Sequence, residues 1–164
     1  MKLIHTADLH LGSKLDSVFS RELAKRRKNE LISSFERMIA YAEANGVSDR
    51  IDFLKCDLMS EVVLGEYFAL LSNPPYVADK IYEGLEGEIF HEPKMAFVGG
   101  DDGGDFYRRL TPIYRDKIAN DGFIAYEIGY DQAEMLRQIA EECSMTCEIL
   151  KDLGGNDRVA VLRK

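Results

Sequence analysis

The feature that most limits how this chain can fold is a buried strand that stops at two prolines. Residues 67–71 read Tyr-Phe-Ala-Leu-Leu, a continuously apolar run typical of a parallel strand covered on both faces. The sequence Asn-Pro-Pro-Tyr at residues 73–76 (the NPPY segment) follows, and two prolines end a strand because neither has an N–H group to donate. Since helices cover the faces of parallel sheets, this pattern favours an α/β fold.

The other periodic segments predict strands that alternate with helices. We expect strands over residues 2–7, 51–55, 123–128, 146–150 and 159–162, and helices over residues 20–45, 106–118 and 132–143. The Asn45-Gly46 pair marks the end of the long first helix. Residues 154–157, Gly-Gly-Asn-Asp, predict a turn between the last two strands. We therefore predict a mostly parallel, doubly wound sheet with a C-terminal antiparallel hairpin, built as a single domain over residues 1–164.

Composition excludes several classes of protein. The 164 residues are 46% apolar, which predicts a folded chain, and the net charge of −8 argues against general nucleic-acid binding. No run of eighteen apolar residues is present, and the N-terminus lacks a long apolar stretch, so neither a membrane span nor secretion is expected. Three cysteines, Cys56, Cys143 and Cys147, suit a reducing compartment, and we expect a cytoplasmic protein.

The NPPY segment also carries the most specific chemistry in the sequence. In open α/β sheets, ligands bind beyond the carboxyl ends of the strands, which is where this segment is predicted to lie. The proline carbonyl groups can only accept hydrogen bonds, whereas the Asn73 side chain both donates and accepts. Such a rigid set can hold a planar NH2 group and aim its nitrogen at an electrophile. A simple Asn-Pro-Pro turn is the alternative interpretation.

The NPPY motif after a strand resembles the signature of amino-methyltransferases that use S-adenosylmethionine. Other motifs narrow the resemblance, because they occur in order along the chain at residues 49–58, 71–77, 91–93, 99–108, 127–132 and 152–159. Residues 45–164 thereby resemble the C-terminal part of the HemK/PrmC-type protein-(glutamine-N5) methyltransferases. That family modifies the GGQ glutamine of peptide-chain release factors.

The resemblance implies a truncated class I (Rossmann-like) methyltransferase fold and S-adenosylmethionine as the cofactor. Asn73 and the Pro74 carbonyl would hold the substrate glutamine amide, with Tyr76 packed near it. Asp57 and Leu58 match the loop beside the adenine of the cofactor, and Asn73 would also lie at the cofactor site. Catalysis would then be mainly orientation of the amide nitrogen, and no general base is required.

The N-terminal part departs from this pattern. The family has a D-L-G-x-G-x-G loop after its first strand, and residues 8–14 here read Asp-Leu-His-Leu-Gly-Ser-Lys. Asp8 and Gly12 are kept as cofactor-binding candidates, but His10 and Lys14 replace glycines and would crowd the cofactor. The predicted helix over residues 20–45 also leaves no room for the family's second strand and its ribose-binding acid. We therefore expect impaired cofactor binding.

Residues 1–47 resemble the opening of SbcD-type exonucleases, which are metallophosphoesterases. In that family a D-x-H motif supplies two metal ligands, which correspond here to Asp8 and His10. The net charge also changes, from +2 over residues 1–48 to −10 over residues 49–164. We therefore expect a chimeric chain, in which a nuclease-like strand and helix (residues 1–47) complete the sheet of a methyltransferase-like body (residues 48–164).

Two alternative functions follow from these departures. The first is a catalytically inactive methyltransferase-fold scaffold that forms a homo-oligomer through apolar surface exposed by the missing strand. The second is a metal-dependent phosphoesterase remnant in which Asp8 and His10 bind a divalent metal, although two ligands alone bind a metal weakly.

Overall fold

A computed structural model of the chain describes residues 3–6, 20–47, 49, 52, 54, 56–84 and 94–164. The chain divides into two compact units. The first contains Met1–Asp8, Asp57–Leu85 and Lys94–Lys164, and the second contains Leu9–Cys56 and Glu86–Pro93. In the described residues, no helix combines the length and the apolarity needed to cross a membrane.

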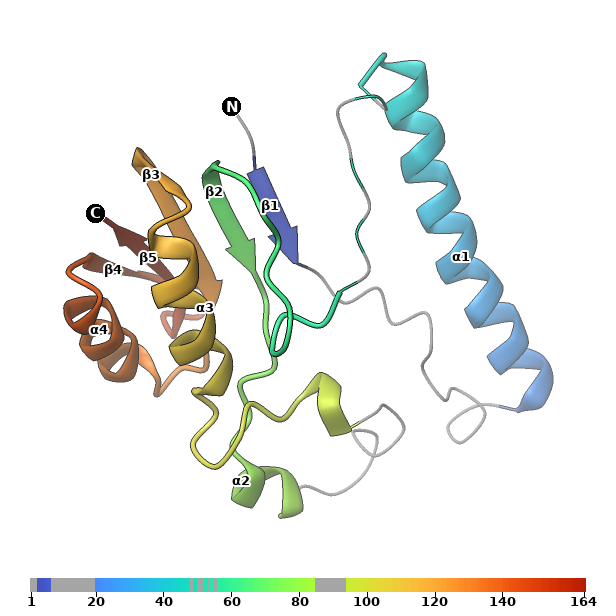
Figure 1. The fold of residues 1–164 in the computed structure, drawn as a ribbon. Coiled ribbons are helices and arrows are strands. Elements are labelled where there is room, and N and C mark those ends of the chain that lie inside the picture. The colour runs from blue at the N-terminus through green and yellow to red at the C-terminus, as the bar shows by residue number, and fades with distance from the viewer. Residues whose placement is uncertain are drawn as a thin grey trace. The chain divides into compact units, whose positions relative to one another are not determined.

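The first unit is built on a five-stranded sheet with the order β1-β2-β3-β5-β4 (Figure 1). Its strands are β1 (Leu3–Thr6), β2 (Tyr67–Ser72), β3 (Ile118–Glu127), β4 (Thr146–Lys151) and β5 (Asp157–Arg163). β1, β2 and β3 are parallel neighbours, whereas β5 is antiparallel to both β3 and β4. The prediction of a mostly parallel sheet that ends in an antiparallel hairpin is therefore confirmed.

The register brings the ends of the parallel strands together. Thr6 of β1 pairs with Ser72 of β2, and Ser72 pairs in turn with Tyr126 of β3. The parallel strands β1, β2 and β3 therefore end side by side at the carboxyl edge of the sheet. Asn73 is the first residue beyond β2 at this edge, and Glu127 is the last residue of β3.

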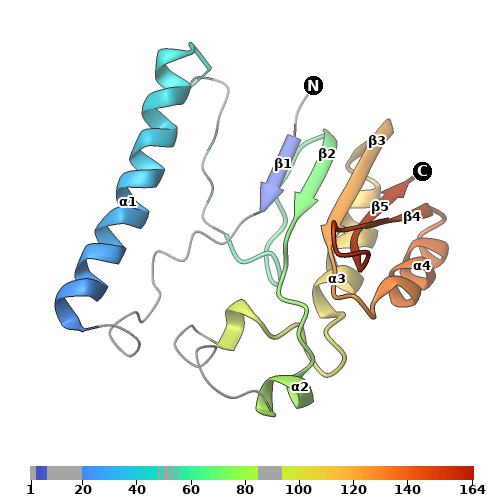
Figure 2. The same ribbon diagram turned by 180° about the vertical axis from the view of Figure 1, so that it is seen from behind.

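Two helices, α3 (Asp105–Arg115) and α4 (Ala133–Glu142), contact each other and cover the same face of this sheet (Figure 2). Both are amphipathic, and their apolar faces close a core with the inward side chains of β2, β3 and β5. The Tyr107 and Tyr126 rings meet edge to face in this core, with their centroids 5.2 Å apart. Other fully buried side chains of the core are Leu70, Leu110, Tyr114, Ile124, Leu136 and Leu162.

The second unit contains the long helix α1 (Arg21–Ala44). The Ser20 hydroxyl accepts a hydrogen bond from the Leu23 N–H at 3.4 Å, which caps the first turn. At the other end, the Asn45 side chain donates to the Tyr41 carbonyl at 2.8 Å, and Gly46 has a φ of +64°. The predicted stop at Asn45-Gly46 is therefore confirmed, because glycine adopts this left-handed conformation without a Cβ clash.

Some predicted boundaries were wrong. The helix predicted over residues 106–118 ends at Arg115, and β3 begins at Ile118 rather than at Phe123. Ile118 pairs with Tyr67 of β2, and the register then shifts before Phe123, so this irregular pairing lengthens the strand. Two short helices were not predicted, α2 (Asp79–Glu83) and a 3-10 turn at Lys94–Ala96. In the predicted strand 51–55, residues 51, 53 and 55 lie outside the described residues.

Candidate functional site

The NPPY segment leaves the sheet between two fixed neighbours. Ser72, the last residue of β2, is buried, and it pairs in register with residues of the neighbouring strands on both sides. Asn73 is exposed, whereas Pro74 is buried and Pro75 is partly buried. Asn73 is therefore open to solvent at the carboxyl edge of the sheet, and the predicted place of the NPPY segment directly after a strand is confirmed.

Tyr76 ends the segment and reaches toward the neighbouring strand. Its hydroxyl donates to the Glu127 carboxylate at a distance of 3.4 Å. Burial raises the pKa of the Tyr76 phenol, and the nearby Glu127 charge raises it further. The phenol therefore stays protonated at neutral pH. It can donate a hydrogen bond, but it is not suited to act as a base.

A second loop supports the NPPY segment from outside the sheet. The Val77 N–H donates to the Phe97 carbonyl at 2.8 Å, and the Gly99 N–H donates to the Val77 carbonyl at 3.0 Å. Gly99 lies against the Pro75 carbonyl, and a Cβ atom at Gly99 would overlap that oxygen. Gly99 therefore allows the two loops to pack closely against each other.

A buried glutamine joins these loops. The Gln132 side-chain N–H donates to the Tyr76 carbonyl at 2.9 Å, and its side-chain oxygen accepts from the Gly129 N–H at 2.9 Å. Sequence reasoning assigned no role to Gln132, although it closes the motif at residues 127–132 that supported the family resemblance. One signal for its role was available in the sequence: the Gln132 side-chain amide, at the start of a predicted helix, can both donate and accept hydrogen bonds.

The residues predicted to lie beside the adenine form a tight turn ahead of β2. Leu58 is half-buried against the core. The Asp57 carboxylate accepts from the Met59 N–H at 3.0 Å and from the Ser60 hydroxyl at 2.9 Å. Asp57 is exposed, and each of its carboxylate oxygens keeps a second lone pair. The turn could therefore still accept a hydrogen bond from a ligand.

The other predicted ligands, Asp8, His10 and Gly12, lie outside the described residues, so the cofactor loop and the metal pair stay predictions. In the described part of the chain, no group of three or more His, Cys, Asp and Glu side chains is placed to hold a metal.

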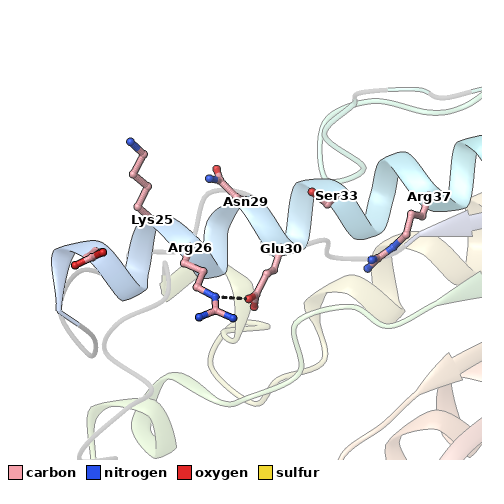
Figure 3. Close-up of a pocket in the computed structure, with 7 residues that line it drawn as sticks. Lys25, Arg26, Asn29, Glu30, Ser33 and Arg37 are labelled. Carbon is pink, nitrogen blue, oxygen red and sulfur yellow. Dashed lines mark hydrogen bonds and ion pairs between the residues drawn. The ribbon is translucent and has the colours of Figure 1, made fainter.

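A cavity of about 520 Å³ lies along α1 in the second unit (Figure 3). Arg26 on its wall donates to Glu30 at 3.1 Å. Its lining mixes both signs of charge, which is typical of a solvated helix face, and contains none of the predicted site residues. The lining residues are Glu22, Lys25, Arg26, Asn29, Glu30, Ser33 and Arg37.

Comparison with known proteins supports the family resemblance that the sequence motifs indicated. A scan against family models finds no match. The chain is 32% identical over 163 residues to the release factor glutamine methyltransferase of Fusobacterium nucleatum, an alignment that covers 96% of this chain and 46% of the relative. The corresponding protein of Bacillus cereus is 30% identical over 166 residues, with 95% of this chain and 58% of the relative covered. The chain thus spans about half the length of the curated relatives it matches.

Among solved structures, a release-factor-specific protein-(glutamine-N5) methyltransferase from Alicyclobacillus acidocaldarius is 27% identical. It aligns with 60% of this chain and 50% of its own length, at a TM-score of 0.39.

The mixed sheet, parallel over β1, β2 and β3 and reversed in its C-terminal hairpin, is consistent with the predicted Rossmann-like fold. The chain is homologous over most of its length to release factor glutamine methyltransferases. These relatives lend no support to the phosphoesterase or to the inactive scaffold. The Fusobacterium alignment includes most of residues 1–47 as well, and the nuclease-like origin of that part stays a prediction.

Proposed function

We propose that this chain transfers a methyl group from S-adenosylmethionine to the side-chain nitrogen of a glutamine in a peptide-chain release factor. The observation that carries the proposal is the exposed Asn73 at the carboxyl end of β2, within an NPPY segment held by its neighbours. Sequence identity to the release factor glutamine methyltransferases, at 32% and 30%, supports the same substrate.

Two of the described residues support the proposed cofactor. Asp57 offers an exposed carboxylate with free lone pairs, which suits the adenine amino group, and the half-buried Leu58 beside it offers an apolar contact for the ring. We propose that Asp8 and Gly12 contribute from the segment after β1, since β1 and β2 end in register at the same edge. When bound, S-adenosylmethionine supplies an electrophilic methyl group on a positively charged sulfur.

The chain's own contribution is to hold the nucleophile. A carboxamide nitrogen is a weak nucleophile because its lone pair is delocalised into the carbonyl group. The Asn73 side chain and the Pro74 carbonyl would accept the two amide hydrogens of the substrate, and the Asn73 NH2 group would donate to the substrate carbonyl. Tyr76 would pack beside the amide with its protonated hydroxyl turned to Glu127. Orientation of the nitrogen, rather than base catalysis, would then lower the barrier. As the new N–CH3 bond forms and the S–CH3 bond of the sulfonium breaks, the amide nitrogen would give up one of its two hydrogens as a proton to solvent.

The setting of the reaction follows from the substrate. We propose that the chain acts in the cytoplasm, where release factors work, and its three cysteines are unpaired, as expected for a reducing compartment. A homo-oligomer remains a prediction, to be checked from the mass of the chain in solution.

The test is methyl transfer by the 164-residue chain to a purified release factor and to a GGQ peptide, followed by mass spectrometry. The expected product gains one methyl group on the glutamine. Asn73→Ala removes the proposed amide contacts and should lower the rate roughly a hundredfold. Asn120→Ala changes an exposed asparagine on β3, near the opposite edge of the sheet, and should leave the rate unchanged. An unmodified glutamine at saturating S-adenosylmethionine would overturn the proposal.

A further inference from the structure

Gln132 is a buried polar side chain to which the proposed methyl transfer has so far assigned no part. It stands at the start of α4 with 6% of its surface exposed. A buried amide is costly unless its groups are paired, and that of Gln132 is paired to four different segments of the chain. Those segments are the NPPY segment, the loop before α3, α3 itself, and the turn between β3 and α4.

The two ends of the amide have separate partners. The nitrogen donates to the Tyr76 carbonyl at 2.9 Å and, more weakly, to the Gly103 carbonyl at 3.5 Å. The oxygen accepts from the Gly129 N–H at 2.9 Å and from the Tyr107 hydroxyl at 3.3 Å. The single O–H of the buried Tyr107 is shared with the Glu127 carbonyl, the closer acceptor at 2.9 Å, which ties the network to the end of β3.

These contacts hold one end of a segment whose other end is already fixed. Ser72 is locked into the sheet between Thr6 and Tyr126. Pro74 and Pro75 each have a φ near −65°, so little backbone freedom remains between Ser72 and Tyr76. Fixing the Tyr76 carbonyl therefore restricts the backbone path of the NPPY segment, from which the Asn73 side chain and the Pro74 carbonyl project.

We propose that Gln132 is a positioning residue for methyl transfer, because its side-chain N–H holds the Tyr76 carbonyl and thereby aims the NPPY segment at the substrate amide. This inference rests on the proposed function. Gln132 does not touch the substrate in this scheme, and it acts through Asn73 and Pro74.

The sharpest variant is Gln132→Glu, which keeps the shape and the accepting oxygen but loses the N–H donor to Tyr76. Gln138→Glu is its matched control, because Gln138 is exposed on the same helix and the change in charge is the same. Gln132→Met, an uncharged side chain of similar length that lacks both amide contacts, serves as the second variant if the buried carboxylate prevents folding.

Amide hydrogen exchange measures whether the Gln132 side chain holds the Tyr76 carbonyl, and it requires no catalytic activity. In Gln132→Glu we expect the Val77 amide, which follows the Tyr76 carbonyl, to exchange at least about tenfold faster. The Gly129 amide keeps an accepting oxygen and should exchange at the wild-type rate, as should Leu162 in the sheet. In Gln132→Met, both the Val77 and the Gly129 amides should exchange faster.

Kinetics then separate positioning from a merely structural role. For Gln132→Glu we expect kcat to fall roughly tenfold to a hundredfold, while the Kd for S-adenosylmethionine stays within about twofold of the wild type. Equal kcat in Gln132→Glu and Gln138→Glu, or a lower kcat with unchanged Val77 exchange, would overturn the inference. A wild-type chain that transfers no methyl group overturns the proposed function instead, and the exchange rates then decide alone whether Gln132 holds the segment.

Discussion

The main chain of Gly103 lies so close to the carbonyl group of Tyr76 that a Cβ atom at residue 103 would overlap the carbonyl oxygen. Gly103 also has a φ of +79°, a left-handed conformation that disfavours any residue with a side chain. Gly155, in the turn between β4 and β5, has a similar φ of +85°, but no atom lies within 4 Å of its Cβ position. The two glycines therefore share the conformational constraint, and Gly103 alone of this pair adds a steric one.

Gly103 and Gly155 allow the free-energy cost of the left-handed conformation and that of the steric overlap to be measured separately. Gly155→Ala should lower the free energy of unfolding by about 1 kcal/mol, because only the left-handed conformation is penalised. Gly103→Ala should lower it by a further 1–3 kcal/mol or so, since the new methyl group must displace the Tyr76 carbonyl. Urea denaturation followed by circular dichroism measures both values. Equal losses for the two variants would show that the close contact with Tyr76 carries no energy.

The buried hydroxyls of Thr111 and Tyr126, 3.2 Å apart between α3 and β3, predict a strong coupling. Thr111→Val keeps the shape but leaves the Tyr126 hydroxyl without this partner, and should cost about 1–3 kcal/mol in unfolding free energy. The double variant with Tyr126→Phe removes both polar groups and should be more stable than the sum of the single losses predicts. A double-mutant cycle measured by thermal and urea unfolding checks this. Strictly additive losses would contradict the coupling.

The ion pair between Asp102 and Arg108 predicts a pH dependence of stability. Hydrogen bonds from the Arg108 guanidinium, at 2.8 and 2.5 Å, lower the pKa of Asp102 to about 2, and the Gly104 N–H helps. A carboxyl whose pKa is lower in the folded state contributes stability above its unfolded pKa of 3.8, and that stability is lost as the pH falls through about 2. The Asp102 side chain is half exposed, so the contribution is at most about 1 kcal/mol.

Asp102→Asn tests this directly. The variant should be less stable than the wild type at pH 6, and the difference should shrink toward pH 2, where the wild-type carboxyl is about half protonated. Asp101→Asn, at the exposed neighbouring residue, is the matched control for the loss of one charge. Urea midpoints at pH 6, 4, 3 and 2 give the comparison. A constant difference across this range would rule out the linkage.

The contact between the Tyr76 hydroxyl and the Glu127 carboxylate predicts a raised pKa for Tyr76, which can be measured without a catalytic assay. Because burial and the Glu127 charge both raise the pKa of Tyr76, the phenol should titrate above its ordinary value of 10.0. Glu127→Gln removes the charge but not the burial, so the pKa should fall only part of the way back. NMR titration of ring-labelled tyrosine measures it. An unchanged pKa in Glu127→Gln would show that the carboxylate does not act on the phenol.

The same pair predicts which part of Tyr76 matters for methyl transfer. Tyr76→Phe keeps the ring and should lower kcat by less than about fivefold, whereas Tyr76→Ala removes the packing surface and should lower it at least about tenfold. Kinetics with the GGQ peptide at saturating cofactor provide the measurement. A hundredfold loss in Tyr76→Phe would assign a direct chemical role to the hydroxyl.

Local patterns predicted much of this molecule because they depend on near neighbours in sequence. The apolar run of residues 67–71 followed by two prolines predicted β2 and its end, and the Asn45-Gly46 pair predicted the end of α1. The glycine-rich turn at residues 154–157 predicted the β4–β5 hairpin. The boundary between α3 and β3 was wrong because Ile118 is drawn into the sheet by Tyr67, a partner far away along the chain.

The sequence by itself therefore determined the class of fold, the reversed hairpin and the place of Asn73 directly after a strand end, since strand and turn propensities act over a few residues. Tertiary structure alone decided which groups meet at that end. Gln132 bonds to Tyr76 and Gly103, and Tyr76 bonds to Glu127, only because parallel strands in register bring their carboxyl ends to one edge. A buried amide must find its partners in three dimensions, and that requirement joins α4 to the NPPY segment.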